Sequence, residues 1–174
     1  MYDEIFSHDN MIEFQSILKE NNETITTAES CTGGLVSSMI TEISGSSSIF
    51  RGSVVTYCND IKEQELNVKK ETMIQFGVVS TEVIEEMLIG VIKKFDANYA
   101  IAISGIAGPN GGSKEKPVGT VAIGVLAQNG NKKIDIFHFK GDRKEVQIQA
   151  AKMALKINFE ILLRNSWHLF LNRL

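Results

Sequence analysis

Hydrophobic residues along the first part of the chain follow two spacings, one typical of helices and one typical of strands. In residues 9–20 the apolar positions recur every three or four residues, which predicts an amphipathic helix. Residues 24–28 are rich in β-branched side chains and predict a short strand, whereas residues 35–43 return to helical spacing. The pair Gly33-Gly34 separates these two segments, so we expect a strand-to-helix turn there.

The middle of the chain repeats the order of a strand followed by a helix. Residues 53–58 predict a buried strand, and Asn59-Asp60 are typical N-cap residues for a helix that follows it. Another helix is expected to start at Ser80, because the apolar residues after it form one stripe down to Asp96. Strands and helices therefore continue to alternate.

Three further strands are expected in the second half. Residues 99–103 are continuously apolar, which is typical of a central strand covered on both faces. Residues 118–127 and 132–140 flank Asn129-Gly130, a strong signal for a two-residue β-hairpin turn. The sequence thus adds an antiparallel pair to strands that otherwise alternate with helices.

The chain closes with a helix, and the whole pattern predicts the fold class. Apolar residues recur at helical spacing from Val146 to Leu162, after a helix start signal at Gly141-Asp142. The order of elements predicts an α/β protein with three α/β/α layers, in which helices cover both faces of a mixed sheet. The 174 residues contain no linker, so we expect one domain, residues 1–174. In such sheets ligands bind beyond the carboxyl ends of the strands.

Composition excludes several classes of protein. Apolar residues make up 43% and charged residues 22% of the chain, as in folded globular proteins. The net charge of −3 argues against a nucleic-acid partner. The apolar runs are too short for a membrane span and the start of the chain is acidic, so we expect no membrane partner and a cytoplasmic location. Two cysteines, Cys31 and Cys58, are too few for a four-thiolate metal site, and we expect Cys58 in the core.

The first candidate for chemistry is Ser30, at the expected turn between a strand and a helix. Free backbone N–H groups at such a turn can stabilise an oxyanion or a phosphate. Ordinary helix capping by Ser30 or Thr32 explains the same residues. A serine nucleophile needs a base, and none of His8, His138 and His168 is well placed in the sequence to act as one.

A lysine base is the remaining option. Tyr57 and Lys62 flank the second strand-to-helix junction, which lies beside Ser30 if the two strands are neighbours. Burial lowers the pKa of a lysine towards the range in which the neutral amine accepts a proton. The alternatives are a solvated lysine, a half-buried tyrosine and, in place of the serine, a Cys31 thiolate without a histidine partner.

The glycine-rich segment 104–112 follows the expected central strand. Its residue order matches neither the Walker A phosphate loop nor the dinucleotide-binding fingerprint. Its backbone N–H groups, with Lys114 and Lys116 nearby, can still hold a smaller anion. A flexible loop is the alternative interpretation.

Several blocks of sequence over most of the chain follow the order and spacing of one known family. The blocks are residues 28–34, 50–57, Asn59 with Lys62, 76–80, 105–109, 111–112, 116–121 and 141–143. They resemble the CinA C-terminal domain family, whose stand-alone members include nicotinamide-nucleotide amidases. The resemblance implies a bacterial enzyme that hydrolyses the carboxamide of nicotinamide mononucleotide to nicotinate mononucleotide and ammonia. It implies a small-molecule nucleotide as the substrate, and neither a cofactor nor a metal.

The resemblance also implies roles for individual residues. Ser30 would be the nucleophile, Lys62 the general base, and Tyr57 a hydroxyl that aids proton transfer or orientation. Backbone N–H groups of residues 32–34 or of the turn at 104–105 would form the oxyanion hole. The residues implied in substrate binding are Glu29, Thr32, Gly33, Gly34, Ser104, Gly105, Gly108 and Arg143.

The chain departs from the family pattern at three positions. Ser104 stands where threonine is usual, Ser53 where a second glycine is usual, and Gln147 where an arginine is common. If that arginine holds phosphate, affinity falls here. These departures keep an alternative open, a catalytically degenerate nucleotide-binding or interaction module linked to competence or the DNA-damage response.

The end of the chain is more apolar than a free terminus requires, which indicates that a homodimer can form through it. The residues concerned are Trp167, Leu169, Phe170, Leu171 and Leu174.

Overall fold

Five strands form one mixed sheet in the order β2-β1-β3-β4-β5. The computed structural model describes the backbone of residues 2–171 and the side chains of residues 2–166. Strand β1 pairs in parallel with β2 and β3, and the hairpin of β4 and β5 continues the sheet in antiparallel pairing. The strands are β1 (Ile25–Glu29), β2 (Phe50–Val55), β3 (Tyr99–Gly105), β4 (Thr120–Ala127) and β5 (Lys132–His138).

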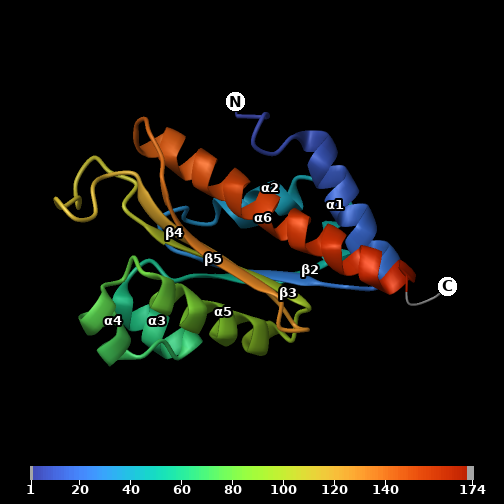
Figure 1. Ribbon diagram of the computed structural model, residues 1–174, viewed down its shortest axis with the longest axis horizontal. Helices are drawn as coiled ribbons and strands as arrows, with labels where there is room; N and C mark the ends of the chain where they lie inside the picture. The colour runs from blue at the N-terminus through green and yellow to red at the C-terminus, as the bar shows by residue number, and fades with distance from the viewer. Residues whose placement is uncertain (1, 172–174) are drawn as a thin grey trace.

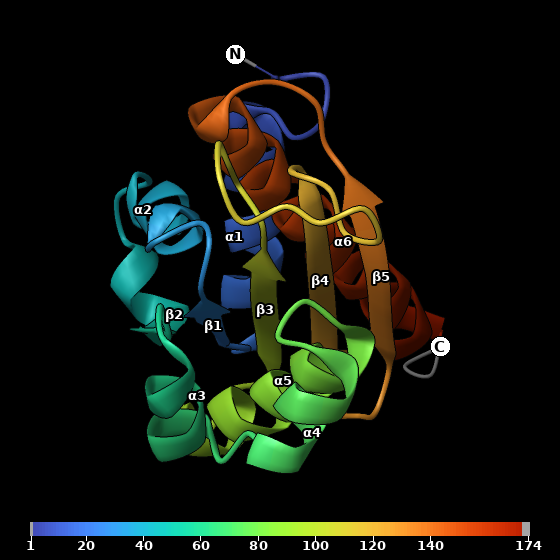
Figure 2. The ribbon, with the colours of Figure 1, turned by 90° about the vertical axis from the view of Figure 1, so that its left-hand side faces the viewer.

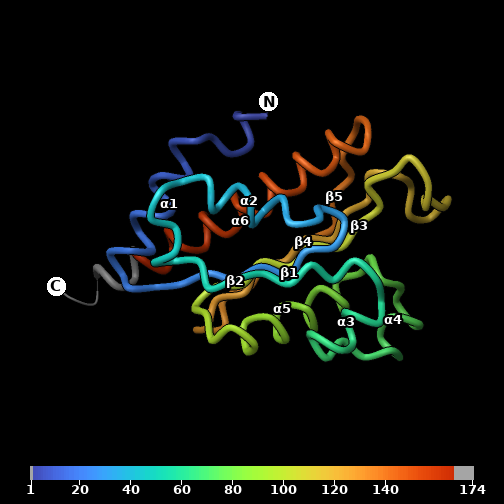
Figure 3. The backbone as a smooth tube through the Cα atoms, turned by 180° about the vertical axis from the view of Figure 1, so that it is seen from behind, coloured from blue at the N-terminus to red at the C-terminus, as the bar shows by residue number. Residues whose placement is uncertain are grey.

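Helices cover both faces of the sheet, which confirms the predicted three-layer α/β/α architecture (Figures 1 and 3). One face carries α1 (His8–Asn21), α2 (Leu35–Thr41) and α6 (Arg143–Leu171). The other carries α3 (Asn59–Leu66), α4 (Lys70–Phe76) and α5 (Thr81–Phe95). A short 3-10 helix, η1 (Ser46–Ser48), lies between α2 and β2.

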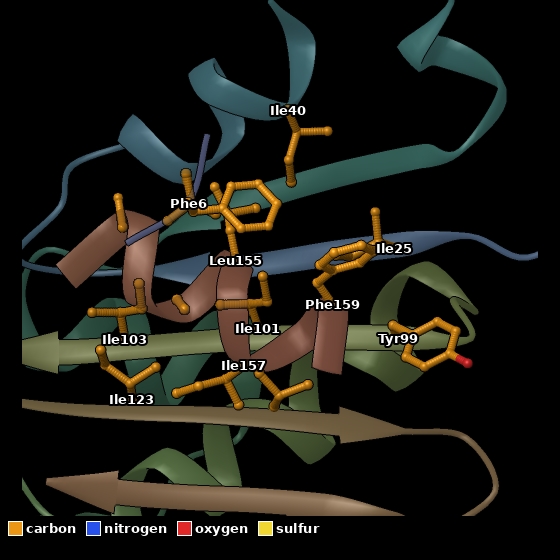
Figure 4. Close-up of a cluster of buried hydrophobic side chains, with 14 of the residues drawn as sticks. Phe6, Ile25, Ile40, Tyr99, Ile101, Ile103, Ile123, Leu155, Ile157 and Phe159 are labelled. Carbon is orange, nitrogen blue, oxygen red and sulfur yellow. The ribbon is translucent and has the colours of Figure 1, made fainter. Parts of the chain in front are cut away.

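Two hydrophobic clusters, one on each face, hold the layers together. In the cluster on the α1 and α6 side, Phe6, Phe14 and Phe159 meet edge to face with ring centroids 5.9–6.5 Å apart. Figure 4 shows Phe6 and Phe159 in this cluster. On the opposite face the apolar stripe of α5, including Val83 and Met87, packs on the sheet and is fully buried. Each such side chain contributes about 1.5–3 kcal/mol by leaving water, so the sheet is anchored from both sides.

Most predicted elements are confirmed. The predicted hairpin connects β4 and β5 through Asn129-Gly130, but the expected two-residue turn is wrong. The Ala127 N–H donates to the Asn131 carbonyl, so residues 128–130 form the loop, and Gly130 alone of the predicted pair has a positive φ. The Ser80 hydroxyl caps α5 by accepting a hydrogen bond from the Val83 N–H at 3.3 Å. Strand β3 is buried on both faces over its first six residues, as the continuous apolar run predicts.

The prediction of a strand over residues 53–58 is wrong at both ends. Strand β2 begins three residues earlier, at Phe50, because it pairs with β1 from Ile25 onwards. It ends at Val55, opposite the last residue of β1, so the chain leaves the sheet there. Cys58 therefore becomes the exposed N-cap of α3, and both its expected place in the core and the expected cap at Asn59-Asp60 are wrong.

Helix α4 was not predicted. It has seven residues, of which only Met73 is buried, so its sequence carries no clear apolar stripe. It contacts α5 beside it, and this contact, rather than the local pattern, accounts for the element.

The three parallel strands end side by side at one edge of the sheet (Figure 2). Glu29, the last residue of β1, lies opposite Val55 of β2 and Ile103 of β3. The next residues of each chain segment therefore meet at this edge, together with the long loop 106–119 that connects β3 to β4.

The described helices contain no stretch that is both long enough and apolar enough to cross a membrane. The apolar tail predicted to support a homodimer, residues 167–174, lies outside the side chains that the structure describes.

Candidate functional site

Ser30 begins a short turn, residues 30–34, that joins β1 to α2 and is called here the Ser30 turn. The Ser30 N–H donates to the Ile103 carbonyl at 3.0 Å, so the turn starts as a continuation of the sheet. The Ser30 carbonyl accepts a hydrogen bond from the Gly33 N–H at 3.1 Å. Ser30 is buried, and both of its peptide groups are held in place.

The carboxylate of Glu29 organises the Ser30 turn from below. It is fully buried and accepts hydrogen bonds from the N–H groups of Gly34, Val36 and Ser37, at 2.8–3.1 Å. The hydroxyls of Thr32 and Ser37 also donate to it, at 2.8 and 2.6 Å. Both carboxylate oxygens accept hydrogen bonds from the turn or from the start of α2. Glu29 and the Thr32 hydroxyl therefore stabilise the conformation of the turn.

Two glycines allow the turn to close around Glu29. Gly33 and Gly34 have φ values of 62° and 97°, where another residue would be strained by about 1–2 kcal/mol. Their N–H groups are already bonded, to the Ser30 carbonyl and to Glu29. Within the described residues, the N–H groups of Cys31 and Thr32 have no hydrogen-bond acceptor, so they are the free donors of the turn.

Lys62 extends from the first turn of α3 beneath the edge of the sheet. Its side chain is only 2% exposed, so the alternative of a solvated lysine is wrong. The Nζ atom donates to the Thr56 carbonyl at 2.7 Å and lies 3.4 Å from the Ser30 Oγ atom. Burial lowers the pKa of the Lys62 amine from its usual value, because desolvation disfavours the charged form.

Tyr57 takes a different direction from the one that the resemblance implies. Its side chain is 61% exposed, and its hydroxyl accepts a hydrogen bond from Arg143 at 2.6 Å. Arg143 also donates to the Gly108 carbonyl at 2.8 Å. Within the described residues Tyr57 makes no hydrogen bond to Ser30 or Lys62. Instead, Arg143 links the Tyr57 hydroxyl to the 106–119 loop through its second hydrogen bond, to Gly108.

The end of β3 contributes Ser104 and Gly105. The buried Ser104 hydroxyl donates to the Val78 carbonyl at 2.7 Å. The Ile106 N–H donates to β4, at the Thr120 carbonyl, and N–H groups along a strand point alternately to its two neighbours. The Gly105 N–H therefore points towards β1, and no acceptor for it is found among the described residues.

A cavity of about 710 Å³ opens beside the Ser30 turn. It lies between the 106–119 loop and the first turn of α6, where Arg143 and Lys144 bring positive charge and Asp142 brings negative charge to its wall. Gln147, one helical turn after Arg143, also lines the cavity, and its Nε2 atom donates to the Cys31 carbonyl at 2.8 Å. Gln147 therefore connects the wall of the cavity to the Ser30 turn.

The lysines of the glycine-rich segment do not act as a pair. The Lys116 amine donates to the carbonyls of Phe76 and Val79, at 2.9 and 2.8 Å, which ties the 106–119 loop to the end of α4. Lys114 is exposed at the tip of the loop. Of the two lysines expected to help bind an anion, Lys114 therefore remains available and Lys116 does not.

The structure disfavours the other candidate nucleophile and bases. Burial raises the pKa of the Cys31 thiol to about 12, so the nucleophilic thiolate is scarce near neutral pH. His8 and His138 make no hydrogen bond to Ser30, and the side chain of His168 lies outside the described residues. In the part of the chain whose side chains are described, no three His, Cys, Asp or Glu residues gather as metal ligands would.

Sequence reasoning missed the parts of the site that are made by the backbone. The Thr56 carbonyl, which holds the Lys62 amine, leaves no signal in the sequence, and neither does the Val78 carbonyl. Ser53, which stands where the family usually has glycine, accepts a hydrogen bond from the Thr27 hydroxyl across the two strands, at 2.7 Å.

The fold of this chain is shared with known proteins. The family model of the CinA C-terminal domain matches residues 9–162, and the chain belongs to this family. It is 48% identical to the nicotinamide-nucleotide amidohydrolase PncC of Escherichia coli, over 86% of this chain and 90% of that protein. It is 47% identical to a CinA-like protein of Fervidobacterium nodosum, over 85% of this chain.

The chain spans about a third of the length of the CinA-like relatives, 35% in the case of the Fervidobacterium nodosum protein. Solved structures share the fold. A competence/damage inducible protein from Agrobacterium tumefaciens, 38% identical, has a TM-score of 0.83 over 84% of this chain and 90% of that chain. A CinA superfamily protein from Klebsiella pneumoniae, 32% identical, has a TM-score of 0.85 over 90% of this chain and 98% of that chain.

Proposed function

We propose that this protein is a nicotinamide-nucleotide amidase that hydrolyses the carboxamide of nicotinamide mononucleotide to nicotinate mononucleotide and ammonia. The observation that carries the proposal is the buried Lys62 amine, 3.4 Å from the Ser30 hydroxyl. The high identity to an amidohydrolase over nearly its full length supports the choice of reaction and substrate.

In the proposed mechanism Ser30 attacks the carboxamide carbon and Lys62 takes its proton. The Thr56 carbonyl holds one N–H of the lysine amine, which leaves the lone pair of the neutral amine free for the serine proton. The desolvation that lowers the Lys62 pKa increases the share of the amine in this neutral form.

The tetrahedral intermediate then collapses to an acyl-enzyme. The protonated Lys62 returns its proton to the amide nitrogen, and ammonia leaves. A water molecule, deprotonated by the same amine, attacks the acyl-enzyme and releases nicotinate mononucleotide, which restores Ser30. The free N–H groups of Cys31, Thr32 and Gly105 are candidates for holding the oxyanion in both steps.

The nucleotide part of the substrate fits the cavity beside the turn. Its volume of about 710 Å³ is within the usual range of small-molecule sites. Arg143 and Lys144 supply positive charge for the phosphate, and Arg143 has five N–H donors, only some of which are used by Tyr57 and Gly108. In this scheme Tyr57 orients Arg143 rather than carrying a proton.

The test is ammonia release from nicotinamide mononucleotide by the purified protein, with and without a chelator. We expect turnover that survives chelation and falls by at least about a thousandfold in Ser30→Ala and in Lys62→Met. Ser38→Ala and Lys70→Met, which change exposed residues on neighbouring helices, serve as matched controls and should keep full activity.

An alternative outcome would point to a different function. If the nucleotide raises the melting temperature of the wild-type protein but no ammonia is released at high enzyme concentration, the chain is a binding module and the amidase proposal is wrong.

A further inference from the structure

Two peptide groups of the Ser30 turn carry the free N–H donors, and they are held in different ways. The Ser30–Cys31 peptide carries the Cys31 N–H, and its carbonyl accepts a hydrogen bond from Gly33 within the turn itself. The Cys31–Thr32 peptide carries the Thr32 N–H, and its carbonyl is bonded only from outside, by Gln147 of α6 at 2.8 Å. The turn therefore fixes one donor locally and depends on a distant helix for the other.

A peptide group is planar, and its C=O and N–H bonds point in opposite directions. A hydrogen bond that fixes the direction of the Cys31 carbonyl thus fixes the direction of the Thr32 N–H as well. On the other side of that N–H, the Thr32 side chain is tied to the buried Glu29 carboxylate at 2.8 Å. With Gln147 in place, the Thr32 N–H is held from both sides.

We propose that Gln147 is a positioning residue, which orients the Cys31–Thr32 peptide so that the Thr32 N–H donates to the oxyanion formed at Ser30. This inference rests on the proposed function and adds to it a residue from α6, 116 positions away in the sequence from Cys31. Figure 2 shows the start of α6 at the end of the sheet where β1 and β3 end. The hydrogen bond from Gln147 to the Cys31 carbonyl joins this part of α6 to the Ser30 turn.

The position of Gln147 also connects the turn to the cavity. Gln147 and Arg143 are four residues apart on α6, so they lie on the same face of the helix, and both line the cavity. A ligand that displaces this face of α6 therefore also moves the donor that holds the Cys31 carbonyl. Binding in the cavity and alignment of the oxyanion donor are linked through one helical turn.

The variant that tests this is Gln147→Met, which keeps the length of the side chain and removes the donor. A misaimed oxyanion donor weakens the transition state more than the bound substrate, so kcat should fall about tenfold to a hundredfold with little change in KM. Gln147→Arg restores a donor, and the cavity leaves room for its longer side chain, so kcat should return to within about threefold of wild type.

Gln149→Met is the matched control on the same helix. Gln149 donates to the carbonyls of Lys140 and Glu145, away from the Ser30 turn, so its loss should leave kcat unchanged. Melting temperatures of all variants show whether the fold is intact. Equal kcat values for Gln147→Met and wild type, or a loss in Gln147→Met that Gln147→Arg does not restore, would overturn the inference.

A second measurement does not depend on the natural substrate. In labelling by a fluorophosphonate the Ser30 oxygen forms a bond to phosphorus, fluoride leaves, and the serine proton passes to Lys62, while negative charge grows on the phosphoryl oxygen. We expect Ser30 to be labelled about tenfold more slowly in Gln147→Met than in wild type, as measured by mass spectrometry.

The two measurements separate the inference from the proposed function. If the wild type does not hydrolyse nicotinamide mononucleotide but is labelled at Ser30, the substrate assignment is wrong and the ratio of labelling rates still decides the role of Gln147. If turnover is present and labelling and kcat are the same in wild type and Gln147→Met, the amidase stands and the positioning role is wrong.

Discussion

The Ser30 turn and the 106–119 loop both follow a parallel strand at the same edge of the sheet, and both are rich in glycine, yet they are held very differently. The Ser30 turn closes around one buried carboxylate, Glu29, which accepts five hydrogen bonds. The 106–119 loop is largely exposed; Arg143 of α6 donates to its Gly108 carbonyl, and its own Lys116 ties it to the end of α4.

The difference separates two tasks. A nucleophile and its oxyanion donors act only if they are already in position, so the Ser30 turn uses a dense, buried network of hydrogen bonds. A loop that lines a ligand cavity can be held by exposed side chains, which cost less to rearrange when a ligand enters. Substitutions in the two regions should therefore change different quantities.

The burial of the Ser30 turn can be measured through its cysteine. We expect an aromatic disulfide reagent to modify exposed Cys58 at least about a thousandfold faster than Cys31, because burial raises the pKa of Cys31 to about 12 and leaves few thiolates near neutral pH. Cys58→Ser should abolish the fast reaction, and denaturant should release the slow thiol. Two fast thiols in the native protein would mean that the turn opens readily.

The largest effect of a single atom change should come from Glu29→Gln. In the glutamine side chain an NH2 group replaces one of the two carboxylate oxygens. All five partners of Glu29 are hydrogen-bond donors, so at least one buried N–H or hydroxyl loses its acceptor. We expect a loss of about 2–3 kcal/mol in the free energy of unfolding and of about a hundredfold in kcat. Denaturant unfolding measures the first, and Glu42→Gln, an exposed glutamate after α2, is the control. An unchanged unfolding midpoint would show that the carboxylate is dispensable.

Arg143→Met should instead affect the loop and the ligand. It removes the bonds to Tyr57 and to Gly108 and one positive charge from the cavity wall. We expect KM for the nucleotide to rise about tenfold to a hundredfold, with kcat changed less than KM. Arg51→Met is the matched control, because Arg51 also donates to a backbone carbonyl, that of Phe95, elsewhere. A fall in kcat with an unchanged KM would show that Arg143 acts in the chemical step and not in substrate binding.

The smallest effect concerns the pH dependence of stability. In the unfolded chain the Lys62 amine titrates near its reference pKa of about 10.4, and in the folded protein burial lowers that pKa. Between the two values the unfolded state binds more protons, so stability rises with pH. The melting temperature of wild type should therefore rise by a few degrees relative to Lys62→Met from neutral pH to about pH 10. If the melting temperatures of wild type and Lys62→Met change in parallel with pH, the pKa of Lys62 is not lowered in the folded protein.

Much of the fold could be predicted from local patterns. The apolar stripe of α5 and its Ser80 cap, the continuous run of β3 and the Asn129-Gly130 hairpin each contain their signal within a few residues. The bounds of β2 could not be predicted, because they depend on where its neighbour β1 begins and ends. Helix α4 has one buried residue and owes its place to packing on α5.

The candidate site was predicted in part. The sequence identified Ser30 and Lys62 as two groups that could lie close together. They do so because each follows a strand, β1 or β2, and these two strands are neighbours in the sheet. The direction of Tyr57 could not be predicted, since it depends on Arg143 at the other end of the sequence. Glu29 was expected to contact substrate, and its place beneath the turn follows only from the way residues 30–34 fold over it.

The sequence by itself determined the order of strands and helices, the family, and the residue types available for chemistry, because these are encoded in local spacing and in short motifs. Only the tertiary structure decided that Lys62 is buried beside Ser30, and that Gln147 of α6 donates a hydrogen bond to the Ser30 turn. The physical reason is that desolvation and hydrogen-bond direction are properties of an environment built by several elements at once. Residues that are distant in the sequence supply that environment, so no single segment can encode it.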